Sequence, residues 1–167
     1  MYMIDLQKKY KKRHFVSFSS IDDKKISISM DHLSFHGVFY GGIILQTVGE
    51  IARNVAMRHA GFLLEDKRID FVHFCRPVKK GDFLICFASI NKAWRSSLEV
   101  GVKVMAEDFL LLEKKKILSA YFTFAVNENE KNIASLPLVV PQTREEKKRY
   151  LFAEKRKLFR FGPFSRR

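Results

Sequence analysis

One long apolar segment constrains this chain more than any other feature of its sequence. Residues 42–59 carry apolar side chains at the spacing of a helix, and Gly61 provides a natural stop. The apolar positions are Ile44, Val48, Ile51, Ala52 and Val55. A helix that is apolar around much of its circumference must be buried, so the rest of the chain has to wrap around it.

Strand-like segments surround this helix in the sequence. One precedes it, and four follow it with short connections; they cover residues 24–30, 67–75, 83–94, 97–108 and 112–126. A single long helix followed by strands joined by turns predicts an α+β fold. In this fold a curved antiparallel sheet wraps around the central helix.

The two ends of the chain differ from its centre in charge. The formal net charge is +13 over 167 residues. Residues 1–13 hold five basic residues and one acidic, residues 144–167 hold ten and three, and residues 14–143 hold 16 and 14. We therefore predict a basic N-terminal arm at 1–13, a folded domain at 14–136, and a proline linker with a basic C-terminal helix at 137–167.

The C-terminal helix is expected to begin with a capping box. Thr143 is a good N-cap, and Glu146 stands where a capping box requires an acid, so we expect a helix to about Arg160.

The basic ends of the chain can attract a polyanion. These basic residues are terminal rather than arranged on the sheet with interleaved aromatic residues, and we find no known nucleic-acid motif, so nucleic-acid binding is not favoured.

Composition and spacing exclude further classes of protein. No apolar run reaches the ~18 residues of a membrane span, and the first residues do not form a secretory signal. Cys75 and Cys86 predict buried free thiols of a reducing compartment. His59 suits the dipole at the helix end, and neither it nor His73 has metal-ligand spacing. We expect a cytoplasmic protein without a metal site.

Several motifs in one order carry a family resemblance. They are HGVFYGGIILQTVGEIARNVAMRHAG, FCRPVKKGD, WRSSLEVGVKV, AYFTFAVNEN and LPLVVPQTREEKKRY, which together cover roughly residues 25–160. This series resembles the hotdog-fold acyl-CoA thioesterases, in the long-chain acyl-CoA hydrolase or YciA-like branch. The resemblance implies one central helix wrapped by a curved sheet, with an extra C-terminal helix.

The same resemblance implies a reaction and an assembly. Acyl-CoA would be split by water into a fatty acid and free CoA, and no separate cofactor is expected because CoA is part of the substrate. Two protomers would pair into a continuous sheet with active sites at the dimer interface, commonly within a trimer of dimers. The alternative is a hotdog protein that binds acyl-CoA with weakened or lost catalysis.

The start of the central helix is the expected oxyanion site. Thioester hydrolysis develops negative charge on the carbonyl oxygen, and N–H groups at a helix N-terminus can hold that charge. Gly41 and Gly42 would let the substrate approach closely. The alternative explanation for this pair is tight packing of the backbone against a strand.

The resemblance also implies a helix acid and a loop asparagine, and the sequence departs from both. Gly49 stands at the usual acid position and Ser34 at the usual asparagine. Glu50 is then the available helix carboxylate, with His36 or Ser34 as its helper. Alternatively, Glu50 is a polar-face residue paired with a neighbour such as Arg53, and His36 only orients the loop.

Phosphate groups of CoA require basic partners, and arginine can bond two of their oxygens at once. The resemblance implies that the candidates are Arg95, Ser96 and Ser97. Arg76, which precedes Pro77 at a strand end, is another candidate, and its alternative is an ordinary surface arginine. A solvated hairpin is the alternative for the first three. On the C-terminal helix, Arg149, Arg156 and Arg160 either form a solvated face or approach the nucleotide of a neighbouring protomer.

Overall fold

The structure, a computed structural model, describes residues 12–26, 33–34, 36–107, 113–128 and 135–161. The elements in chain order are β1 (Arg13–Phe15), the 3-10 helix η1 (Val16–Phe18), β2 (Ile21–Ile26), α1 (Gly41–Ala60), β3 (Glu65–Phe74), β4 (Phe83–Ala93), β5 (Ser97–Glu107), β6 (Lys114–Ala125), β7 (Leu138–Val140) and α2 (Arg144–Phe161). The central helix and the four strands after it are thus confirmed. Of the strand expected at 24–30, residues 27–30 lie outside the described residues.

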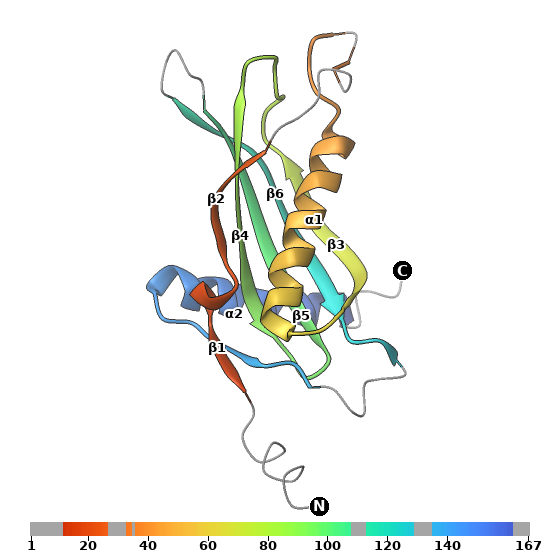
Figure 1. The fold of residues 1–167 in the computed structure, drawn as a ribbon, viewed down its shortest axis with the longest axis vertical. Coiled ribbons are helices and arrows are strands. Elements are labelled where there is room, and N and C mark those ends of the chain that lie inside the picture. Colours follow the sequence, from red (N-terminus) through yellow and green to blue (C-terminus); the bar gives the residue numbers. More distant parts are fainter. Residues whose placement is uncertain (1–11, 27–32, 35, 108–112, 129–134, 162–167) are drawn as a thin grey trace, which may run out of the picture.

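One antiparallel sheet forms the centre of the molecule. Its strand order is β2-β4-β5-β6-β3, and α1 lies along one face of it (Figure 1). Ile44, Val48 and Val55 of α1 are at most 1% exposed and pack with Val100 of β5 and Phe122 of β6. The alternating strand pattern places these side chains on the same face of the sheet. This arrangement is the hotdog fold that the resemblance implied.

Two glycines determine how α1 sits and where it ends. A Cβ atom at Gly49 would lie 3.3 Å from Cε1 of Phe122, so the helix approaches the sheet closely at this turn. Gly61 has a left-handed backbone, with φ of 82°, and its N–H donates to the Met57 carbonyl at 2.8 Å. This is a glycine C-cap, and it confirms the predicted stop.

Replacing the capping glycine should weaken the fold. Gly61→Ala places a Cβ in the left-handed region, so we expect a loss of about 1 kcal/mol in the free energy of unfolding. Urea denaturation measures it. Gly42→Ala is the control, because its added Cβ meets nothing within 4 Å and we expect no destabilisation. Equal losses in both variants would contradict the role of the left-handed cap.

The two ends of the described chain meet in a small second sheet. β1 and β7 pair in parallel, with Arg13 opposite Leu138 and Phe15 opposite Val140. The segment expected as an extended linker therefore contains a strand, and Arg13, expected in the arm, begins one. The predicted start of α2 is confirmed, because Thr143 N–H donates to Glu146 Oε2 at 3.1 Å and Glu146 N–H donates to Thr143 Oγ1 at 3.2 Å.

Helix α2 crosses the sheet face opposite α1 (Figure 1) and is fixed there by a buried carboxylate. Glu99 of β5 is 0% exposed. Its oxygens accept hydrogen bonds from Arg156 Nη2 at 2.6 Å, Arg160 Nη2 at 2.7 Å and Asn91 Nδ2 at 3.0 Å. The expectation of a solvated face is therefore wrong for Arg156 and Arg160, since they anchor α2 internally. Arg149 is exposed.

Two smaller expectations also need correction. Cys86 is buried and its pKa is raised to about 12 by burial, but Cys75 is exposed. Cys75 was expected to be buried; it follows the edge strand β3, whose residues leave it open to solvent. His59 is buried, which lowers its pKa, and its Nε2 lies 3.1 Å from the Pro137 carbonyl. A neutral ring that contacts the chain before β7 replaces the expected charge at the helix end.

Two features that the described residues lack bear on function. These residues contain no group of three histidine, cysteine, aspartate or glutamate side chains that could hold a metal ion. Within the same residues, neither helix has the length and hydropathy needed to cross a membrane.

Candidate active site

The start of α1 presents free backbone donors. Gly41 and Gly42 occupy the first turn, where N–H groups have no acceptor within the helix, and among the described residues no side chain caps this end. A Cβ at Gly41 would lie 2.8 Å from Cε1 of Phe74, whereas one at Gly42 would meet nothing within 4 Å. Gly41 therefore permits packing against β3. Gly42 leaves open space in front of the donors and the positive end of the helix dipole.

An apolar hollow of about 310 Å³ adjoins this helix start. It is lined by Phe39, Gly41, Ile44, Phe74, Cys75, Arg76, Pro77 and Val78. An apolar wall beside backbone donors suits a molecule with a carbonyl group and a hydrocarbon chain. Arg76, one of the predicted phosphate partners, is exposed at its rim.

The loop before α1 is shaped by Ser34. Its Oγ accepts the Val38 N–H at 3.3 Å, and its carbonyl accepts the Gly37 N–H at 2.9 Å. Gly37 has φ of 73°, a conformation that favours glycine at this tight turn. His36 is exposed in the same turn. The structure thus places both predicted helper residues just before the helix start.

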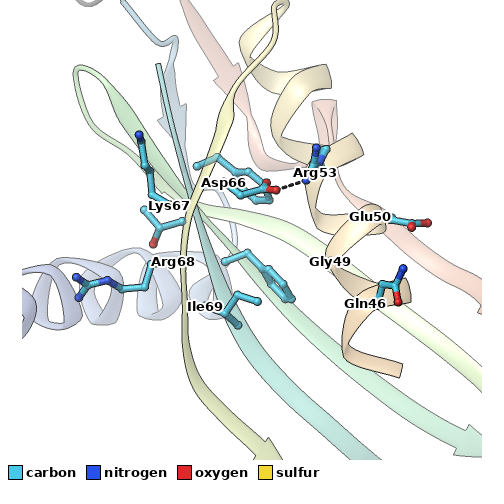
Figure 2. Close-up of a pocket in the computed structure, with 11 residues that line it drawn as sticks. Gln46, Gly49, Glu50, Arg53, Asp66, Lys67, Arg68 and Ile69 are labelled. Atoms are coloured by element: carbon cyan, nitrogen blue, oxygen red, sulfur yellow. Dashed lines mark hydrogen bonds and ion pairs between the residues drawn. The ribbon is translucent and has the colours of Figure 1, made fainter. Parts of the chain in front are cut away.

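A groove of about 500 Å³ separates α1 from β3. Figure 2 shows an ion pair between Arg53 of α1 and Asp66 of β3 across it. Glu50 is exposed, and in Figure 2 its carboxylate points away from β3. The expected pairing of Glu50 with Arg53 is therefore wrong, because Arg53 is turned toward Asp66. Phe122 and Phe124 also line the groove.

The predicted site residues do not converge within one chain. Glu50 follows Gly42 by eight residues, which is about 12 Å along a helix. The hairpin of Arg95, Ser96 and Ser97 lies at the other end of the sheet, because Ser97 pairs with Ala125 and Ala125 pairs with Glu65. The 20-residue helix α1 spans about 30 Å between these ends.

The edge strand β3 has apolar side chains that no described element covers. Ile69, Phe71, Val72 and Phe74 are 47%, 57%, 37% and 46% exposed. β3 pairs with β6 on one side only, so its other edge keeps unpaired backbone groups. Neither this surface nor the role of Asp66 was predicted from the sequence. The charged stretch EDKR that opens the strand, next to an apolar end, was the available signal.

A curved sheet around one helix, with donors at the helix start and an open edge strand, defines a hotdog-fold protein. The thioesterase superfamily model matches residues 36–112. Protein VdlD of Helicobacter pylori is 35% identical over 127 residues, which cover 76% of this chain and 72% of that protein. The chain belongs to the thioesterase superfamily, among its hotdog-fold acyl-CoA thioesterases.

Further relatives agree with this assignment. The human cytosolic acyl coenzyme A thioester hydrolase is 28% identical over 119 residues. These residues cover 70% of this chain and 31% of the human protein. An apo-hexameric acyl-CoA thioesterase superposes with a TM-score of 0.85 and 28% identity, covering 93% of this chain and 99% of the other. The Staphylococcus aureus acyl-CoA hydrolase, solved with butyryl coenzyme A and coenzyme A, gives a TM-score of 0.80 and 29% identity, covering 89% and 90%.

Three variants of the Staphylococcus aureus enzyme have also been solved, each with alanine in place of one residue. The replaced residues are an asparagine, an aspartate and a threonine. The asparagine and aspartate are separated by the same interval as Ser34 and Gly49, and the aspartate and threonine by the same interval as Gly49 and Asp66. Ser34 and Gly49 are the positions at which this sequence departs from the pattern of the family that its motifs resemble.

Proposed function

We propose that this protein hydrolyses acyl-CoA thioesters to a fatty acid and free CoA. The observation that carries this proposal is the open start of α1. The first-turn donors at Gly41 and Gly42 have no acceptor within the helix, and Gly41 lines an apolar hollow, in a fold whose relatives are acyl-CoA hydrolases. The runner-up function, binding of acyl-CoA without turnover, is favoured only by Gly49 and Ser34.

The helix start supplies the electrostatic part of the reaction. A water oxygen attacks the thioester carbonyl carbon, and the electron pair of the C=O bond moves to its oxygen. The N–H groups at Gly41 and Gly42 stabilise this oxyanion, because they are fixed in place before the charge develops. When the oxyanion collapses, the C–S bond breaks and the CoA sulfur leaves with a proton.

Self-association completes the site in this proposal. Two β3 edges related by a two-fold axis run antiparallel, which extends the sheet and covers Phe71 and Val72. The two-fold axis also reverses the partner's direction. The hairpin at Arg95 of one protomer is thereby brought toward the helix start of the other, across the 30 Å that separates them in one chain. Trimers of such dimers would match the hexameric relative.

The same arrangement assigns the CoA phosphates. Arg95, Ser96 and Ser97 would bind the nucleotide end of a substrate whose thioester lies at the partner's helix start. Arg76, at the rim of the apolar hollow, is a second phosphate contact. CoA enters and leaves as part of the substrate, and no further cofactor is proposed. A cytoplasmic location is proposed from the human cytosolic relative.

Release of CoA from a series of short to long acyl-CoAs tests this function directly. We expect turnover by the purified protein, measured from the free thiol that appears. Glu50→Ala, tested in parallel with its oligomeric mass, decides the role of the helix acid. Lost turnover with intact mass would make Glu50 the working acid, with His36 or Ser34 beside it. Bound but unhydrolysed acyl-CoA in the natural protein would instead establish the runner-up function.

A further inference from the structure

We infer that Asp66, on β3, supplies the carboxylate that activates water, in place of an acid on the central helix. This inference rests on the proposed function and deepens it. Its starting point is an exchange between two positions that line one groove. Gly49 of α1 has no side chain where a helix acid would project, and Asp66 of β3 brings a carboxylate to the opposite wall.

The sequence intervals support this exchange. Gly49 and Asp66 have the same separation as the aspartate and threonine that were replaced in the Staphylococcus aureus enzyme. This chain therefore has no acid at the first position and gains one at the second. At this pair of positions, the carboxylate is moved from the helical wall of the groove to its strand wall.

The geometry of the groove favours Asp66 over Glu50. Asp66 points toward α1, where it forms an ion pair with Arg53, whereas Glu50 points away from β3 (Figure 2). Asp66 of β3 pairs with Phe124 of β6, so its side chain lies on the face of the sheet that α1 covers. The Asp66 side chain is nevertheless 52% exposed, so a substrate and a water molecule can reach it. Arg53 acts as a positioning residue, because it fixes the carboxylate in the groove.

The step assigned to Asp66 is proton removal from the attacking water. One carboxylate oxygen accepts a proton as the water oxygen bonds to the carbonyl carbon, and the oxyanion is held at Gly41 and Gly42. The proton then passes to the leaving sulfur, so that the products are a fatty acid and a CoA thiol. Asp66 lies near Arg53, about 18 Å along α1 from Gly41. The helix start that works with Asp66 must therefore come from the partner protomer.

Asp66→Asn tests the assignment, because the amide keeps the shape and loses the basic oxygen. We expect kcat for acyl-CoA hydrolysis to fall by about 10²–10⁴, with little change in KM, as for removal of a general base. Arg53→Gln is the matched control, since it breaks the same ion pair and leaves the carboxylate. Its kcat should fall by less than about tenfold.

The outcomes separate this inference from the proposed function. A natural protein that releases no CoA from any acyl-CoA would overturn the function itself. A natural protein that is active, with Asp66→Asn equal to it in kcat, would overturn only the role of Asp66. Equal losses in Asp66→Asn and Arg53→Gln, matched by equal drops in thermal midpoint, would show that the ion pair is merely structural. Loss in Glu50→Ala with an unaffected Asp66→Asn would return the role to the helix.

Discussion

Glu99→Leu is expected to lower the free energy of unfolding by about 3–5 kcal/mol, the range for a buried ion pair that loses one partner. The carboxylate is fully buried and accepts hydrogen bonds from Arg156 and Arg160. The side chains of these arginines are only 12% and 6% exposed. Without Glu99, both guanidinium groups lose their buried acceptor, and among the described residues only Arg160 keeps a carboxylate partner, Asp70 at 2.8 Å.

Urea denaturation followed by circular dichroism measures this loss. Glu113→Gln is a suitable control, because Glu113 is 61% exposed and forms its ion pair with Lys115 at the surface. We expect the control to change stability by less than about 1 kcal/mol. A Glu99→Leu protein as stable as the control would show that other contacts hold α2, such as those of Glu154 with Lys92 and Trp94.

Two inactive variants are expected to restore activity to each other when they are made in the same cell. The first is Asp66→Asn. The second is Gly42→Pro, which removes a first-turn N–H that has no acceptor within the helix and is tolerated there by the backbone. Loss of an oxyanion donor costs about 10²–10³ in kcat, so each variant alone should be nearly inactive.

The restoration follows from a site shared between protomers. In a mixed dimer, one site receives both defects, and the other receives an intact Asp66 from one chain and an intact Gly42 from the other. Random pairing makes about half of the dimers mixed, so about a quarter of the natural activity should return. Differently tagged chains purified as mixed oligomers allow kcat to be measured per site. If Asp66 and Gly42 of the same chain worked together, every site would hold a defect and no activity would return.

The sequence predicted the framework of this fold closely and its long-range contacts poorly. Helix α1 was expected at 42–59 and runs from Gly41 to Ala60, because its apolar face and the stop at Gly61 are local signals. Glu99 appeared to be an ordinary member of an alternating strand. Its partners lie 57 and 61 positions later in the chain, and no local pattern points to them.

The candidate site was only partly predictable for a similar reason. Gly41 and Gly42 could be assigned because the chemistry of an oxyanion requires a helix start. Asp66 could not, because its relation to Gly49 depends on how β3 lies beside α1. The interpretation of Cys75 failed on the same strand, since alternation alone does not tell an edge strand from a covered one.

The parallel pair β1 and β7 links the beginning of the described chain to a segment synthesised more than a hundred residues later. Until Leu138 has left the ribosome, Arg13 has no strand partner and the His59 ring lacks the Pro137 carbonyl that it contacts. In a nascent chain that stops before this point, the C-terminal end of α1 stays uncovered even if the sheet has already formed. Emergence of residues 137–140 is therefore a condition for closing this end of the fold.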